Sequence, residues 1–265
     1  MFGPMDEALD NESYFAKAEA ALCRLFDAAR ATNELHFAQS LGLEFRGAQD
    51  PGWNTAADAQ RAFDDYADFI HGADPSPIKV RVALAFYVHL AEAGGYYEMP
   101  KNMLRVAGGD LYTTRPFAEL VKKSKSGAIV APNANRMAQS IAGHAHDLGF
   151  SDLSEVFRDA FDPDIRNGYA HADYILWEDG IRLRKRNGGQ PRIVSYREFT
   201  ERLHRATGLF ERLRRIGAEC VQSYEPKRTI TGRLHAEPLG YWDIEFDSST
   251  GQYSISSPGF VPGAS

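Results

Sequence analysis

Apolar residues recur at steps of three and four through much of this chain, which is the period of an amphipathic helix. Residues 12–41 follow this pattern, and residues 55–72 repeat it. Residues 78–93 are apolar nearly all round, which predicts a central buried helix that ends at the Gly94–Gly95 pair. The same pattern predicts three shorter helices, over residues 116–123, 135–148 and 152–160.

Two helix starts carry the residues of a capping box, in which a first side chain and a Glu three positions later each bond to a main-chain N–H group. Asp152 with Glu155 is the first of these pairs, and Ser195 with Glu198 is the second. The second pair precedes a long apolar repeat that extends to Ile216. We therefore expect helices to begin at both positions.

Strand-like patterns occupy two other parts of the chain. Three short runs, 175–178, 181–185 and 192–195, are separated by turn-forming residues and predict a small β excursion. Beyond Pro226 apolar and polar residues alternate, which predicts a three-stranded meander over residues 228–257. The expected fold class is mainly α: a helical bundle with a β-hairpin excursion and a C-terminal antiparallel meander. Two domains are expected: a helical one over residues 1–225 and the C-terminal meander with its tail over residues 226–265. The helical domain contains the acidic N-terminal helices (1–75) and the motif region (152–215).

Composition excludes several classes of protein. The 265 residues carry 30 basic and 36 acidic side chains, a net charge of -6, so the whole molecule is no polycation. No apolar run reaches the roughly 18 residues that span a bilayer, and the acidic N-terminus lacks the order of a signal peptide. Cys23 and Cys220 are too few for a disulfide scaffold. We expect a soluble, cytoplasmic protein without membrane contact.

The charges are unevenly distributed. Residues 181–215 hold eleven basic and three acidic side chains, a local charge of +8, whereas residues 1–75 hold fourteen acidic and five basic ones. One interpretation of this basic stripe (residues 181–215) is a site for a polyanion. The other is a solvated helix face with ion pairs between helices. The acidic N-terminal helices are then either a docking surface or a shield for the basic stripe.

The segment from Asp162 to Tyr174 contains the residues best suited to chemistry. Asp162 suits an N-cap and Pro163 the first helical position, so a helix is predicted to begin there, and its free N–H groups are suited to an anion. At about 100° per residue, one buried face is expected to contain Ile165, Gly168, Ala172 and Leu176. The opposite surface is expected to contain Arg166, Asn167, Ala170, His171 and Tyr174.

These residue types suit cleavage of an RNA phosphodiester. The imidazole of His171 can take a proton from a 2′-hydroxyl or give one to a leaving 5′-oxygen. The guanidinium of Arg166 can hold the phosphate oxygens as charge builds on them. This route needs no metal and no cofactor. His144 and His146 lie about 160° apart on a helix, which favours structural or surface roles over a metal site.

The residues Arg166-Asn167-x-x-x-His171 resemble the R-N-x3-H motif of HEPN domains, a mostly helical superfamily with many metal-independent endoribonucleases. The following Ala172-Asp173-Tyr174, the β excursion and the Ser195 helix also look like prokaryotic members. The resemblance implies a bundle that forms a homodimer with a composite cleft. It also implies that Arg166 and His171 are catalytic and that Asn167 supports them. It covers residues 152–215.

The sequence thus predicts an RNA-cutting enzyme in a toxin–antitoxin or antiviral defence setting, with a protein inhibitor or antitoxin as a further partner. We expect its RNA to be bound by Tyr174 and by the basic residues that follow, Arg182, Arg184, Lys185 and Arg186. The alternative function is a non-catalytic HEPN-like module that binds a nucleotide, RNA or a protein partner.

Overall fold

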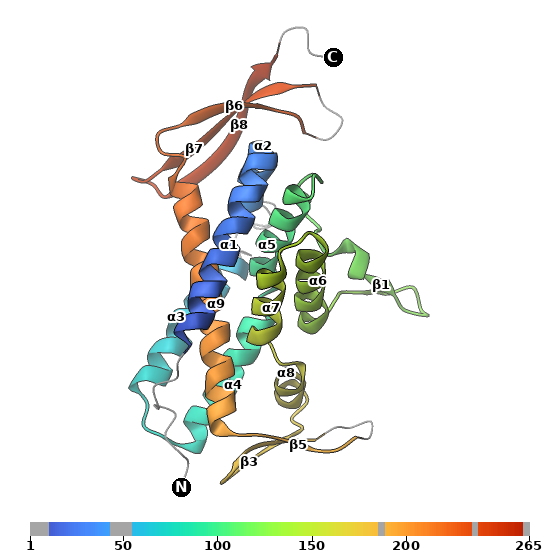
Figure 1. Ribbon diagram of the computed structural model, residues 1–265, viewed down its shortest axis with the longest axis vertical. Coiled ribbons are helices and arrows are strands. Elements are labelled where there is room, and N and C mark those ends of the chain that lie inside the picture. Colours follow the sequence, from blue (N-terminus) through green and yellow to red (C-terminus); the bar gives the residue numbers. More distant parts are fainter. Residues whose placement is uncertain (1–10, 43–54, 185–188, 235–237, 262–265) are drawn as a thin grey trace.

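The computed structural model describes residues 11–42, 55–184, 189–234 and 238–261, and it shows a long bundle of helices with small sheets at its ends and side (Figure 1). The expected mainly helical class is confirmed. The helices are α1 (Glu12–Thr32), α2 (Glu34–Leu41), α3 (Thr55–Gly72), α4 (Pro77–Glu92), α5 (Gly94–Ala107), α6 (Ala134–Asp147), α7 (Ser151–Ala160), α8 (Pro163–Ala170) and α9 (Tyr196–Gln222).

The core lies where α1, α4, α5 and α9 pack together. The nearly all-apolar sequence of α4 is explained by its position, since most of its length is buried between other helices. Aromatic rings fill much of this space: Phe63 stacks on Phe210 with centroids 5.0 Å apart, and Phe63 also meets Phe86 edge to face. Rings in these arrangements contribute attraction beyond their buried area.

The helices differ from the expected ones at three places. Residues 12–41 form two helices because Asn33 adopts an extended conformation and its side chain caps α2 by accepting from the His36 N–H at 3.2 Å. The central helix does end where expected, with Ala93 as its C-cap, but Gly94 and Gly95 then begin α5, a helix that the sequence did not predict. Residues 116–123 contain only a single 3-10 turn (Ala118–Leu120).

The two expected capping boxes also differ from the structure. α7 begins at Ser151, and the preceding Phe150 supplies no side-chain cap, so the box at Asp152 is wrong. Ser195 does cap α9, because its Oγ accepts from the Glu198 N–H at 3.1 Å. The carboxylate of Glu198 instead accepts from Arg192 at 2.6 Å, so only half of the second box forms.

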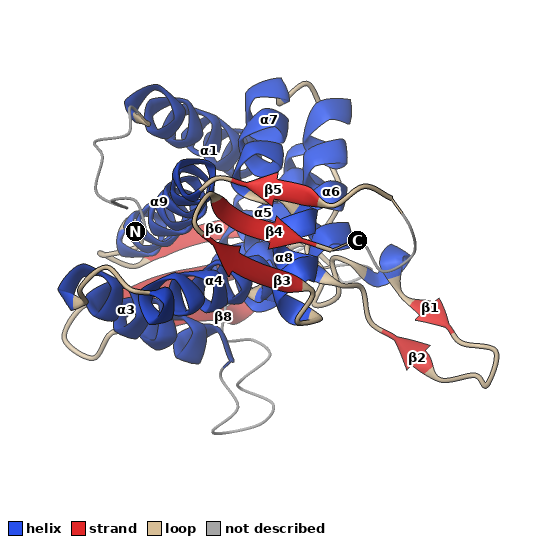
Figure 2. Ribbon diagram, turned by 90° about the horizontal axis from the view of Figure 1, so that it is seen from below, coloured by secondary structure: helices blue, strands red, loops and turns tan. Residues whose placement is uncertain are grey.

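The described residues also form three antiparallel sheets. They are β1 (Lys122–Lys123) with β2 (Ile129–Val130); β3 (Tyr174–Trp177), β4 (Gly180–Leu183) and β5 (Arg192–Val194) in that order; and β6 (Arg228–Gly232), β7 (Gly240–Asp247) and β8 (Gln252–Phe260) in that order. The predicted excursion and meander are confirmed. The β1–β2 hairpin extends away from the helices (Figure 2).

The C-terminal sheet packs against the helices through α2. Gly232 of β6 lies so close to Leu35 that a Cβ at this position would sit 2.7 Å from the Leu35 side chain. The Tyr253 hydroxyl donates to the Ala38 carbonyl at 3.0 Å, and Ile244 is part of the common core. The boundary expected after residue 225 stays a prediction, since the sheet shares this core.

Asp162 connects α8 to the rest of the molecule. Its buried carboxylate accepts from the Asp164 and Ile165 N–H groups at 2.9 and 3.3 Å, as the N-cap prediction requires. The same carboxylate pairs with Arg192 at 2.7 Å, while the main-chain N–H of Asp162 donates to the hydroxyl of Tyr87 on α4. One residue thereby holds α4, α8 and the strand β5 together.

We expect Asp162→Ala to lower the free energy of unfolding by about 2–4 kcal/mol, because it removes a helix cap and leaves Arg192 without a buried partner. Asp162→Asn keeps the cap and loses only the charge, so its cost should be about half as large. Urea denaturation of both variants measures the difference. A loss below about 0.5 kcal/mol for the alanine variant would contradict this role.

Candidate functional site

α8 ends one turn earlier than its sequence pattern predicts. The Asp173 N–H donates to the Gly168 carbonyl at 2.8 Å and the Ala172 N–H to the Tyr169 carbonyl at 3.0 Å. These two bonds form a Schellman motif, whose penultimate residue needs a left-handed backbone, and Ala172 has φ of 53°. The expected buried face is therefore wrong beyond Gly168: Ala172 is exposed and lies outside the helix.

The strand β4 packs against this end of α8 and holds it in place. A Cβ on Gly168 would lie 2.7 Å from the side chain of Leu183, so the absence of a side chain lets α8 rest directly on β4. The Arg184 N–H then donates to the Asp173 carbonyl at 2.9 Å. The turn after His171 is thus bonded to the helix on one side and to the small sheet on the other.

Arg166 and Asn167 are brought together at the side of α8. The Arg166 Nη1 donates to the Asn167 Oδ1 at 2.9 Å, and Asn135 of α6 donates to the same oxygen at 3.3 Å. Arg166 also pairs with the carboxylate of Glu92, to which its Nε donates at 2.6 Å and its Nη2 donates as well. The side chain of Arg166 is 15% exposed, so it is held in place but reachable.

The bonds of Arg166 decide how it could hold a phosphate. A guanidinium has five N–H groups, of which three donate to Glu92 and Asn167. One N–H on each terminal nitrogen remains for an incoming anion. The acidic residues nearest to Arg166 in the sequence, Asp162 and Asp164, bind Arg192 instead.

Sequence reasoning did not identify Glu92 or Asn135. A signal for Glu92 was present, because it is the only acidic residue in the otherwise apolar α4 and stands at its end. Asn135 had no such signal, since its position beside α8 depends on how α6 packs.

His171 occupies the C-cap of α8 and is exposed to solvent. Its main-chain N–H donates to the Asn167 carbonyl at 3.1 Å. Five residues on a helix correspond to a rise of about 7.5 Å and a rotation of about 140°. Arg166 and His171 are therefore separated by about 140° around the axis of α8, and Asn167 bonds to the side chain of Arg166 and to the main chain of His171.

The expected RNA-binding residues are placed unevenly around this motif. Tyr174 does not belong to the motif helix as predicted but begins β3, where its ring stacks on Tyr169 with centroids 5.7 Å apart. Arg182 lies over the Trp177 ring and pairs with Asp179 at 3.1 Å. Arg184 is exposed next to the turn after His171. Lys185 and Arg186 lie outside the described residues.

The basic stripe is not an open cationic surface where the structure describes it. Glu19 of α1 pairs with Arg215 at 2.7 Å, and Asp64 of α3 pairs with Arg214 at 3.0 Å. Arg197 pairs with Glu201 of its own helix, and further arginines bond to main-chain carbonyls or lie over rings, namely Arg202, Arg205 and Arg212. The interpretation as ion pairs between helices is confirmed for Arg212, Arg214 and Arg215, which pair with Glu19 of α1 and Asp64 of α3.

A small hollow adjoins the motif. It has a volume of about 290 Å³ between α6, α7 and the start of α8, and its polar lining includes Asn135, Gln139 and Arg158. Asn135 is also the residue that bonds to Asn167. The hollow is large enough for a polar group of a ligand beside the motif. The part of its lining that the structure describes contains no side chain that could act as a general acid or base.

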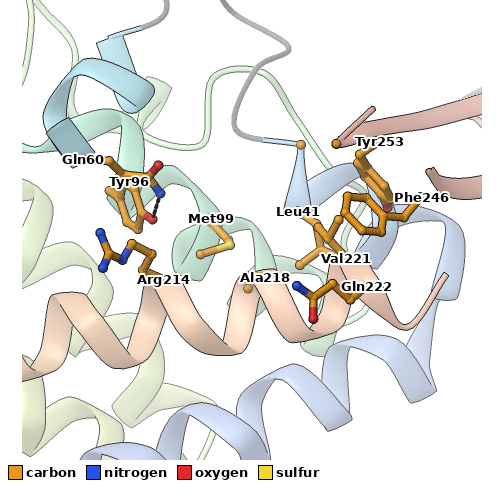
Figure 3. A pocket seen from close by; sticks show the side chains of 13 residues that line it. Leu41, Gln60, Tyr96, Met99, Arg214, Ala218, Val221, Gln222, Phe246 and Tyr253 are labelled. Carbon is orange, nitrogen blue, oxygen red and sulfur yellow. Dashed lines mark hydrogen bonds between the residues drawn. The ribbon is translucent and has the colours of Figure 1, made fainter. Parts of the chain in front are cut away.

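A larger pocket lies at the other end of the molecule, between α9, α5 and the C-terminal sheet (Figure 3). Its volume is about 460 Å³, with Gln60 donating to the Tyr96 hydroxyl at one end and Phe246 and Tyr253 at the other. No imidazole, thiol or carboxylate lines it among the described residues. It therefore offers shape but no acid–base groups.

Other reactive or aromatic side chains away from α8 are wholly or partly buried among their neighbours. Tyr97 is fully enclosed and cannot stack on a base, and burial raises the pKa of the Cys220 thiol to about 11, which makes it a poor nucleophile. His144 lies 3.5 Å from Lys101, and burial lowers its pKa. Within the described ranges, no three His, Cys, Asp or Glu side chains are grouped to hold a metal, and no helix there is long and apolar enough to cross a membrane.

We expect Ala172→Gly to raise the free energy of unfolding by about 0.5 kcal/mol. Glycine removes the cost of a left-handed backbone, about 1–2 kcal/mol for other residues, but adds flexibility to the unfolded chain. Ala172→Val should lower stability by more than 1 kcal/mol, because a β-branched side chain is poorly tolerated there. Urea denaturation checks both, and equal stability of the two variants would contradict the left-handed turn.

Comparisons with protein-family models, with curated proteins and with solved structures found no match to this chain. The resemblance to HEPN domains therefore depends on the motif and its surroundings in the sequence.

Proposed function

We propose that this chain is a metal-independent endoribonuclease of the HEPN type. The observation that supports this most directly is the arrangement on α8, where Asn167 bonds to Arg166 through its side chain and to His171 through its carbonyl. A guanidinium with free N–H groups and an exposed imidazole are thus mounted on one short, firmly anchored helix. A toxin or defence role remains part of the proposal.

The proposed reaction is transfer of the phosphoryl group to the 2′-oxygen. His171 takes the proton of the 2′-hydroxyl, and that oxygen attacks phosphorus while the bond to the 5′-oxygen breaks. The leaving oxygen takes a proton from a second acid, and the products are a 2′,3′-cyclic phosphate and a free 5′-hydroxyl. The two remaining N–H groups of Arg166 hold the equatorial oxygens as their charge grows.

A homodimer would supply that second acid. Because Arg166 and His171 are separated by about 140° around the axis of α8, a second copy placed beside the helix would add another imidazole to the cleft. The outer face of the β3–β5 sheet supports such contact, since Ile175, Trp177 and Ile193 are exposed on it, 61%, 52% and 53% respectively. Ile175 and Ile193 flank Arg182 in the strand register and so share one face. Exposed apolar clusters of this kind mark interaction surfaces.

The second candidate function is a non-catalytic binding module, and the Glu92–Arg166 pair favours it. A carboxylate that already holds the guanidinium gives Arg166 a structural role that needs no substrate. The hollow beside Asn135 would then receive the ligand. The two candidates differ in one measurable property, which is cleavage.

We expect His171→Ala to reduce cleavage of labelled total RNA at least 100-fold, in line with the usual contribution of general acid–base catalysis. The exposed His146 on α6 provides a matched control, and His146→Ala should cut RNA like the wild type. Arg166→Ala should also lose cleavage, and EDTA should have no effect. If the wild type binds RNA without cutting it, the endoribonuclease proposal is overturned and the non-catalytic binding module is supported.

We expect Ile193→Glu to weaken self-association at least tenfold, because it buries a charge in the apolar sheet face. Phe260→Glu changes an equally exposed apolar residue on the distant strand β8 and should leave self-association unchanged. Sedimentation velocity over a range of concentrations measures both variants. A wild type that stays monomeric would contradict the dimer.

A further inference from the structure

A second cationic element precedes α6, the helix whose Asn135 bonds to Asn167 of the motif. It is the β1–β2 hairpin with its flanks, residues 121–131, here named the lysine arm. Its lysines, Lys122, Lys123 and Lys125, are all exposed, and the arm contains no acidic residue. None of the three forms an ion pair with any residue that the structure describes. The arm thus presents unpaired charge, unlike Arg212, Arg214 and Arg215 of the basic stripe, which pair with acidic side chains.

The strand register distributes this charge over both faces of the arm. Lys122 pairs with Val130, and Lys123 pairs with Ile129. Cross-strand partners lie on one face and successive residues on opposite faces, so each face has one lysine and one aliphatic residue, with Lys125 at the tip. An apolar face that could enter a bilayer is therefore missing, and the arm is suited to lie among phosphates.

The tip of the arm has a defined shape. The Ser124 N–H donates to the Ala128 carbonyl at 2.8 Å, and the Gly127 N–H donates to the Ser124 carbonyl at 2.9 Å. Gly127 has φ of 81°, which glycine adopts without strain. Lys125 is therefore carried on a closed turn.

The base of the arm is anchored beside the motif. Arg136 of α6 donates to the Leu120 carbonyl at 2.9 Å, and Glu119 pairs with the buried Lys101 of α5 at 3.3 Å. The arm leads into α6, whose second residue, Asn135, bonds to Asn167. Five extended residues from Leu120 to Lys125 span roughly 17 Å. The lysines thus lie within the length of a few nucleotides from the base of the arm, which α6 connects to the motif.

We propose that the lysine arm holds the RNA backbone next to the motif, in place of the basic stripe. This inference rests on the proposed function, and it names the surface that binds the substrate. Each phosphate that a lysine neutralises releases condensed counterions, so its contribution appears in the salt dependence of binding. Sequence-independent contact of this kind would position RNA, while the α8 motif would act on it.

The test replaces Lys122, Lys123 and Lys125 together by Gln and measures binding of a labelled single-stranded RNA with 2′-O-methyl riboses, which the enzyme cannot cut. Three phosphate contacts contribute about 2 to the slope of log K against log salt concentration. We expect the variant to lose that much of the slope and to bind at least tenfold more weakly in 50 mM salt. Its thermal unfolding should match the wild type, because the three side chains are exposed.

A matched control replaces Arg197, Arg214 and Arg215 by Gln, three exposed or half-exposed arginines that are already paired with acids. Its salt slope should equal that of the wild type. If the control loses the slope and the arm variant keeps it, the arm inference is overturned while the endoribonuclease proposal stands. If the wild type neither binds nor cuts any RNA, both fail.

Vesicles of phosphatidylserine and phosphatidylcholine complete the experiment. Because each face of the arm has only one lysine and one aliphatic residue, we expect the wild type and the arm variant to bind these vesicles equally weakly. Arm-dependent vesicle binding with unchanged RNA binding would overturn the inference and assign the arm to an anionic membrane surface instead.

Discussion

A buried carboxylate and a partly exposed guanidinium hold the motif end of the molecule together. Asp162 caps α8, pairs with Arg192 and bonds to the hydroxyl of Tyr87 through its main chain. Arg192 in turn reaches Glu198 in the first turn of α9. Because a central helix, the long final helix and the small sheet all meet at this one pair, the position of Arg166 and His171 depends on it.

The distribution of charge gives the surface its second constraint. Acidic side chains of α1 and α3 lie against arginines of α9, so opposite charges from distant parts of the sequence offset each other where the helices meet. Exposed pairs of this kind contribute little stability each, but they weaken the long-range attraction for anions. Among the described residues, the lysines of the β1–β2 hairpin keep their positive charge unpaired.

Local signals in the sequence predicted much of the fold and part of the candidate site. Asp162 and Pro163 marked the start of α8, and alternation marked the C-terminal sheet, since each of these depends on a few neighbouring residues. The end of α8 could not be predicted in this way, because the left-handed turn falls on an alanine rather than a glycine. α5 was missed since it begins with two glycines and contains Pro100. The partners of the stripe arginines depend on helix packing, which periodicity does not show.

The Glu92–Arg166 pair changes what a guanidinium can contribute when an anion arrives. A phosphodiester held by the two remaining N–H groups would share Arg166 with Glu92, which keeps its bonds to Nε and Nη2. Because this carboxylate already offsets the charge of the guanidinium, Arg166 would add only modest Coulomb attraction for the anion. It would instead favour anions whose oxygens match the two N–H groups that remain in its planar fork. The Glu92–Arg166 pair thus makes this position selective for the shape of an anion rather than strongly attractive to every anion.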